Sequence, residues 1–171
     1  MKKDAKGRRQ TALDDGSTPQ SDVTVMTVRL GNLLTAEGDA FFRNWGITLH
    51  QFNVLRILYV RDPDRQGISR GTIEARLIQR GPDVTRLLDR LESAGLIARH
   101  RPKEDQRTVL ASLTDKGWDL VEKSHQPLLE LNRDQYPNFS KAELTQFIAL
   151  LKKALDRPAQ LTPAKPANRR R

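Results

Sequence analysis

The stretch PDVTRLLDRLESAGLIARHRPKEDQR, residues 82–107, changes its hydrophobic period half-way along. Gly95 marks the change, because it fits the left-handed position that follows a helix, and Leu96 can then fold back on Leu91 as in a Schellman cap. After Gly95, apolar and charged residues alternate as they do in a strand. Before it, apolar residues recur at the spacing of one helical face: Val84, Leu87, Leu88 and Leu91. The stretch therefore predicts a helix joined directly to a β-hairpin.

The alternation continues on both sides of a turn expected at residues 102–106. In the first strand, Ile97, Arg99 and Arg101 are expected on one face, with Ala98 and His100 on the other. A second strand over residues 108–113 alternates in the same way. Two strands this short need helices packed against them to be stable.

Helical signals dominate the rest of the middle of the chain. Apolar residues follow helical spacing over residues 23–44, and Thr48 with Gln51 forms a capping box that opens a helix over residues 48–61. Ser69 is expected to cap a short third helix through about residue 79. The fourth helix is expected to begin at residues 81–82, with proline in the first helical position.

Two more helices are predicted after the hairpin. Thr114 caps the fifth, in which Pro127 predicts a kink or break before residues 136–137. Ser140 with Glu143 forms a second capping box and opens a last helix over residues 141–156. One face of that helix is apolar: Leu144, Phe147, Ile148, Leu151 and Leu155. The fold class is therefore mainly α, with about six helices and a small β-hairpin.

The chain of 171 residues is strongly basic, with 30 Lys and Arg against 21 Asp and Glu and a net charge of +9. Its pI of about 10.2 is typical of nucleic-acid binders, ribosomal proteins and membrane-surface proteins. Residues 1–20 and 158–171 lack hydrophobic periodicity and are expected to be disordered. They carry +2 and +4, which leaves only +3 for residues 21–157. The pI alone therefore overstates the charge of any binding surface.

Several classes of protein are excluded by what the sequence lacks. With no cysteine there is no disulfide, Cys nucleophile or Cys-based zinc site. No apolar run is long enough to span a membrane, and the basic N-terminus has no apolar stretch behind it, so we expect a cytoplasmic, nucleoid-associated protein. The three histidines fall on different predicted elements and no phosphate-binding or nucleophile motif occurs, so we expect no enzyme activity, metal or cofactor.

This order of elements resembles the MarR (multiple antibiotic resistance regulator) family of transcriptional regulators. The resemblance covers residues 25–155, and its third helix, SRGTIEARLIQR, departs from the family's Leu-Ala pair at Ile73-Glu74. It implies a winged helix-turn-helix lobe over residues 48–113 between dimerisation helices at 21–47 and 114–157. The residues that carry it are LHQFNVLRIL (49–58), DVTRLLDRLESAGLIAR (83–99), DQR (105–107) and VLASLTDKG (109–117).

In this family the helix that starts near residue 83 is the recognition helix. Readout concentrates at its N-terminus, which points to Pro82, Asp83, Thr85 and Arg86. Arg86 is the first choice for reading a base, because an arginine pairs with two guanine acceptors in the major groove. Taken alone, Arg86 would more often form a solvated surface pair with an aspartate three residues away. Arg90 lies farther along and either contacts DNA or braces the wing.

The resemblance also assigns the hairpin as a wing. Arg107, with Lys103, is expected to enter a narrow minor groove, where the negative potential is focused. Asp105 is expected to orient Arg107 or to tighten the turn, and the alternative is a solvated hairpin end. Residues expected to meet phosphates, which fix register without reading sequence, are Arg99, Arg101 and His100 on the hairpin and Ser69, Arg70 and Thr72 on the third helix.

The expected partners are double-stranded DNA, a second copy of the chain and a small aromatic or phenolic anion. An intertwined homodimer would place two recognition helices roughly 34–36 Å apart on a pseudo-palindrome and would cover apolar helix faces, which otherwise pack within one chain. The function expected is a sequence-specific, ligand-responsive repressor. The alternatives are a nonspecific architectural DNA-binding protein and a protein-interaction module. The residues suited to the anion are Arg43, Trp45, His50, Tyr59 and Trp118.

Overall fold

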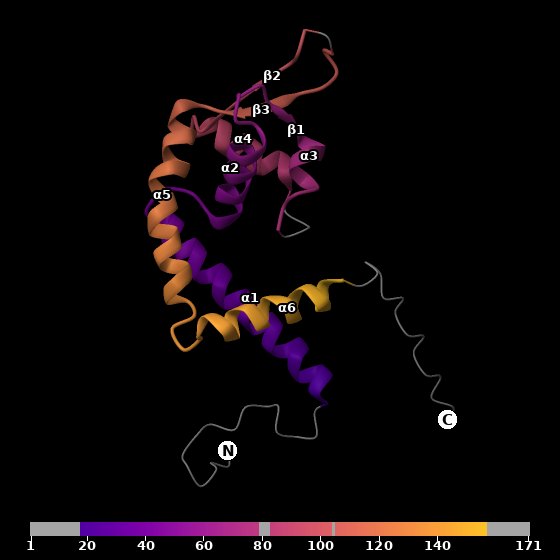
Figure 1. The fold of residues 1–171 in the computed structure, drawn as a ribbon. Helices are drawn as coiled ribbons and strands as arrows, with labels where there is room; N and C mark the ends of the chain where they lie inside the picture. The colour runs from indigo at the N-terminus through magenta and orange to yellow at the C-terminus, as the bar shows by residue number, and fades with distance from the viewer. Residues whose placement is uncertain (1–17, 79–82, 104, 157–171) are drawn as a thin grey trace, which may run out of the picture. The chain divides into compact units, whose positions relative to one another are not determined.

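The computed structural model describes residues 18–78, 83–103 and 105–156. The chain divides into two compact units, with the boundary between Leu129 and Glu130 inside helix α5. A small sheet and several helices confirm the expected fold class (Figure 1). In chain order the elements are α1 (Pro19–Arg43), α2 (Leu49–Arg61), β1 (Ile68–Ser69), α3 (Arg70–Glu74), α4 (Val84–Ser93), β2 (Ile97–His100), β3 (Leu110–Leu113), α5 (Asp115–Asp134) and α6 (Lys141–Leu155).

The core of the first unit is built around α2, which packs against α1, α3, α4 and β3. The capping box predicted for α2 is confirmed: the Thr48 hydroxyl accepts from the Gln51 N–H at 3.2 Å, and the Thr48 N–H donates to Gln51 Oε1 at 2.8 Å. The Phe42 and Phe52 rings stack 4.1 Å apart between α1 and α2. Apolar side chains from the other elements complete the core: Ile73, Leu87, Leu88, Leu91, Ile97 and Leu113.

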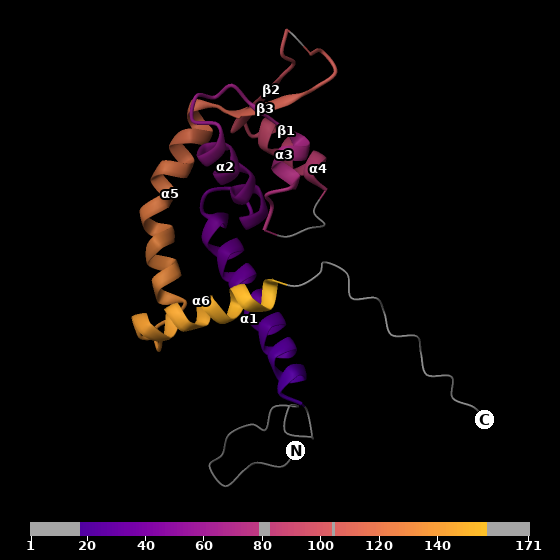
Figure 2. The same cartoon turned by 45° about the vertical axis from the view of Figure 1, so that its right-hand side comes forward.

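The sheet has three strands, in the order β1-β3-β2, and not the two that the sequence predicts. Figures 1 and 2 show it at one end of the first unit, beside α3 and α4. Gly67, with φ of 90°, leads into β1 so closely that an added Cβ would lie 2.8 Å from the Leu110 Cβ. A glycine is therefore needed for β1 to reach β3. Strand β2 ends at His100 and strand β3 begins at Leu110, so the loop between them, the wing loop, is longer than the predicted turn.

Several predicted helix boundaries are wrong. Helix α1 begins at Pro19 because Thr18 caps it, so the helix starts inside the segment expected to be a disordered tail. Helix α3 ends at Glu74, well before residue 79. Helix α4 begins at Val84, since the Asp83 carboxylate accepts the first N–H groups, and residues 81–82 lie outside the described residues. Residues 1–17 of the first predicted tail and all of the second, residues 158–171, also lie outside them.

Helix α5 continues through Pro127, so the break that the sequence predicts there is wrong. A proline removes one main-chain hydrogen bond, but the amphipathic turns on both sides keep the helix intact. The C-terminal capping box is confirmed, because the Ser140 hydroxyl accepts from the Glu143 N–H at 3.3 Å and the Ser140 N–H donates to Glu143 at 2.8 Å. The Ser140 hydroxyl and N–H lower the pKa of Glu143, so this cap is charged at neutral pH.

Candidate nucleic-acid interface

Helix α4 has one buried and one exposed face, as its sequence predicts. Val84, Leu87, Leu88 and Leu91 point into the core. The other face carries the candidate DNA-contacting residues, which are exposed: Asp83, Thr85, Arg86 and Arg90. Packing of the leucine stripe thus fixes which side chains the helix presents to a partner.

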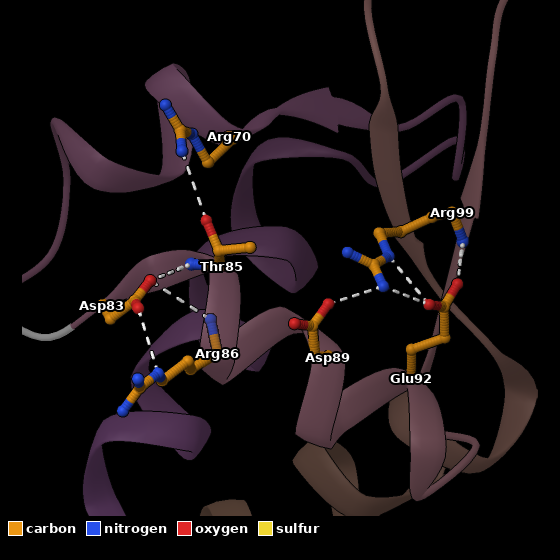
Figure 3. A network of polar contacts seen from close by, with 7 residues as sticks. All are labelled: Arg70, Asp83, Thr85, Arg86, Asp89, Glu92 and Arg99. Atoms are coloured by element: carbon orange, nitrogen blue, oxygen red, sulfur yellow. Dashed lines mark hydrogen bonds and ion pairs between the residues drawn. The ribbon is translucent and has the colours of Figure 1, made fainter.

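The N-terminus of α4 is organised by Asp83. Its Oδ1 accepts from the Thr85 N–H at 3.1 Å and the Arg86 N–H at 3.3 Å, and its Oδ2 lies 3.3 Å from Arg86 Nε (Figure 3). The surface pair expected as the alternative for Arg86 is therefore present. The Arg86 side chain is 80% exposed, and pairs this exposed contribute only about 0–1 kcal/mol. Arg86 could therefore leave Asp83 and contact a DNA base at little cost in free energy.

The start of α3 lies beside this surface. The Ser69 hydroxyl caps α3 by accepting from the Thr72 N–H at 3.2 Å. Arg70 reaches across and its Nη1 donates to the Thr85 hydroxyl at 3.2 Å (Figure 3). Ser69 and Thr72 thus order the helix start, while Arg70 holds a residue of α4.

Arg99 on β2 is tied back to the last turns of α4. Its N–H and Nε donate to the two Glu92 carboxylate oxygens at 3.2 and 2.8 Å, and its Nη2 lies 2.7 Å from Asp89 Oδ1 (Figure 3). Hydrogen bonds from Arg99 lower the pKa of Glu92, and the same pairing raises the pKa of Arg99. Neither acidic residue was predicted as part of the site, since their approach to Arg99 depends on the chain reversing at Gly95.

The wing loop is ordered by Asp105. Its carboxylate accepts from the Arg107 N–H at 2.9 Å and from the Thr108 hydroxyl at 2.6 Å, and the latter bond is the main cause of a lowered Asp105 pKa. Arg101 Nη1 donates to the Gln106 carbonyl at 2.6 Å across the loop. Asp105 therefore tightens the turn, and the side chains of Lys103 and Arg107 are exposed.

Two of the residues suited to an aromatic anion come together between α2 and α5. The Tyr59 and Trp118 rings lie 4.4 Å apart, and Glu122 Oε1 accepts from Trp118 Nε1 at 2.9 Å. Arg65 stacks on Trp118 at 4.7 Å and also pairs with Asp115. The other three lie elsewhere in the first unit: Arg43 is exposed at the end of α1, Trp45 packs against the core from the following turn, and His50 is in the first turn of α2.

A pocket of about 370 Å³ lies beside Tyr59, between α2 and α5. Arg56 and His125 line it, and neither was predicted from the sequence. Arg56 follows Phe52 by four residues and precedes Tyr59 by three, so helical spacing on α2 was a usable signal for it. The remaining lining residues are Phe52, Val60, Val121, Glu122 and Leu128.

Within the residues that the structure describes, none of the helices is long and apolar enough to cross a bilayer. Within the same residues, no group of three or more His, Cys, Asp and Glu side chains is arranged to hold a metal ion.

The known proteins that this chain resembles are transcriptional regulators. Residues 45–108 match the model of the MarR family. The HTH-type transcriptional regulator PecS of Dickeya dadantii is 32% identical over 138 residues, which cover 78% of this chain and 82% of PecS. An HTH-type regulator of Bacillus subtilis, YkoM, is 36% identical over 110 residues, covering 64% and 68%. The MepR–DNA complex of S. aureus has a TM-score of 0.66 at 28% identity, covering 81% of this chain and 96% of MepR.

Proposed function

Since this chain belongs to the MarR family of DNA-binding transcriptional regulators, which are not enzymes, we propose that it represses transcription by binding a pseudo-palindromic operator as a homodimer. The observation that carries the proposal is that helix α4 has one buried and one exposed face. Its core-facing leucines hold the helix against the domain, and its exposed N-terminal residues are presented as a helix in the major groove requires.

Most of the candidate residues have a proposed contact. Arg86 reads a base, with Thr85 and Asp83 beside it at the start of the helix, and Arg90 lies one turn farther on the same face. Pro82, which lies outside the described residues, is proposed as a contact from the sequence alone. Arg107 and Lys103 enter the minor groove from the wing. The residues proposed for phosphate contact, where charge fixes the register of the protein on DNA, are Arg101, Arg70, Ser69 and Thr72.

The exposed apolar residues support a second copy of the chain as the partner. No residue of α6 is buried within one chain, and Ile148 is 52% exposed. On α1, Val23, Met26 and Leu33 are exposed as well. We propose that residues 21–47 and 114–157 dimerise around the winged lobe of residues 48–113, which gives two recognition helices and hence a two-fold operator.

The pocket between α2 and α5 is the proposed effector site. Its apolar walls fit an aromatic ring, Arg56 supplies a cationic group for an anion, and the His125 ring offers a further hydrogen-bonding group. It joins a helix of the winged lobe to a proposed dimerisation helix. An effector that prefers one spacing of the two lobes would release DNA by population shift.

The test is selection of binding sites from genomic DNA by the purified chain, followed by titration of the best site at several salt concentrations. The proposal predicts a palindromic site preferred over unrelated DNA by a factor of about 10³ or more. Near-equal affinity for all duplexes would identify an architectural protein instead. An absence of binding at moderate salt would identify a protein-interaction module.

A further inference from the structure

Arg99 lies on the strand that leads into the wing, yet its polar groups face the recognition helix. Its N–H, Nε and Nη2 donate to Glu92, and Nη2 also lies 2.7 Å from Asp89, three residues earlier on α4 (Figure 3). A guanidinium is planar and presents its donors as a rigid fork, so two carboxylates on successive turns hold it in one orientation.

We propose that Arg99, Glu92 and Asp89 form a clamp that fixes the wing relative to the recognition helix. In this proposal Arg99 is a positioning residue and contacts no phosphate. The inference deepens the proposed DNA-binding function and rests on it.

The junction between helix and wing is the reason that a clamp is needed. Helix α4 passes into β2 through Gly95, which has φ of 70°, and glycine has the widest conformational freedom of any residue. The hydrogen bonds of this reversal hold the chain as far as Leu96, ahead of the strand itself. Arg99 adds a second attachment four residues beyond Gly95. It also sits opposite Ala111 of β3, so the restraint reaches both strands of the wing.

Charge and exposure argue against a phosphate contact. With two carboxylates around one guanidinium, the clamp has a net charge of −1 and does not attract the DNA backbone. The Arg99 side chain is 27% exposed, against 80% for Arg86. Hydrogen bonds that lower the pKa of Glu92 keep that carboxylate ionised at neutral pH, so the pairing persists under the conditions in which DNA is bound.

Glu92→Gln separates the two roles of Arg99, because they predict opposite results. If Arg99 contacts a phosphate, removing a carboxylate beside it leaves operator binding unchanged or tighter. If Arg99 clamps the wing, the dissociation constant rises about tenfold, the size expected for a lost charge-assisted bond. Asp119→Asn is the matched control, since it removes the same charge from the exposed Asp119–Lys123 pair on α5.

Two further readouts distinguish the clamp from a general loss of stability. The clamp predicts that Arg107→Ala weakens binding less in the Glu92→Gln background than in the wild type, because a loosened wing no longer places Arg107. It also predicts that Arg99→Ala leaves the salt dependence unchanged, whereas loss of a phosphate contact lowers its slope by about one. Additive effects in the first experiment, or a lowered slope in the second, overturn the clamp.

Hydrogen exchange on the DNA-free chain tests the clamp without relying on the proposed function. Residues 99–110 should exchange faster in Glu92→Gln than in the wild type or Asp119→Asn, at equal melting temperature of the core. Unchanged exchange in the wing overturns the inference. Wild-type titration with operator and scrambled duplexes tests the DNA-binding proposal separately. If Glu92→Gln does not fold, Arg99→Lys replaces it, because a lysine keeps the charge but loses the fork.

Discussion

Arg86 and Arg99 lie in one short stretch of the sequence but have different surroundings, and these give them different roles. Arg86 faces one exposed carboxylate 3.3 Å away, so the pair is neutral and easily broken. Arg99 faces two carboxylates and also donates its main-chain N–H to Glu92. Residue type and helical face therefore suffice to locate Arg86, whereas the role of Arg99 depends on which acidic groups the fold brings to it.

Arg86→Ala is expected to weaken operator binding by about 1–3 kcal/mol and to relax the preference at one base pair of each half-site. The cause is loss of the two hydrogen bonds that a guanidinium makes to guanine. Titrations against the operator and a set of single-base variants measure both effects. Arg133→Ala, which removes the same charge from an exposed position on α5, is the control. An unchanged base preference in Arg86→Ala would show that another residue reads the DNA.

Glu92 gives the fold a pH dependence whose sign follows from its lowered pKa. Arg99 holds the pKa below its ordinary value of 4.5, so in that range the unfolded chain binds more protons than the folded one. The contribution of Glu92 is complete above pH 4.5 and is lost as the pH falls through the lower, folded value. Denaturant unfolding between pH 7 and pH 3 should show a smaller loss of stability in Glu92→Gln than in the wild type. Equal losses would mean that Glu92 is not preferentially ionised in the folded chain.

At the scale of elements, the end of α4 and the start of α5 are built as one junction. The Leu96 N–H donates to the Leu91 carbonyl at 2.9 Å, which confirms the Schellman cap predicted at Gly95. The Thr114 hydroxyl then donates to the Gly95 carbonyl at 2.7 Å and accepts from the Gly117 N–H at 3.1 Å. One threonine thus caps α5 and fastens it to the end of α4.

Gly117 is required by this junction because of space. An added Cβ would lie 2.0 Å from the Leu96 carbonyl oxygen, which is main chain and cannot move aside. Gly117→Ala is therefore expected to lower the free energy of unfolding by about 3 kcal/mol. Gly31→Ala, where nothing lies within 4 Å of the added Cβ, should instead raise it by about 0.5–1 kcal/mol. Denaturant unfolding of both variants measures the contrast, and equal effects would contradict the packing seen at Leu96.

Local capping chemistry explains which elements the sequence predicts correctly. The capping boxes at Thr48 and Ser140 and the glycine at 95 are recognisable because every participant lies within a few residues of the others. Strand β1 was missed because two residues have no period, and its partner Leu110 is distant in sequence. The start of α4 was misplaced because an aspartate cap outweighed a preceding proline. The same limit applies to the site, where the exposed face of α4 was predictable but the acidic partners of Arg99 were not.

For the whole molecule, the apolar residues that one chain leaves exposed matter most. The second unit has local aromatic packing, with the Phe139 and Phe147 rings 5.9 Å apart, but no residue of α6 is buried. Leu155 is 78% exposed at the end of that helix. Burying such a stripe against its copy contributes about 25 cal/mol for each Å² of apolar surface removed from water. In the proposed dimer, a second chain both covers this stripe and supplies the second recognition helix.

Ile148→Asp tests the dimer, because it places a charge in the middle of the apolar stripe of α6. We expect the variant to sediment as a monomer at concentrations where the wild type is a dimer, since a charge buried without a partner is strongly unfavourable. Operator affinity should fall much more than affinity for a single half-site, because a monomer gains nothing from the second half. Gln146→Asp, exposed on the opposite face of the same helix, should leave both properties unchanged. Helical content by circular dichroism shows whether Ile148→Asp keeps its fold. A folded variant that remains dimeric would place the dimer interface away from α6.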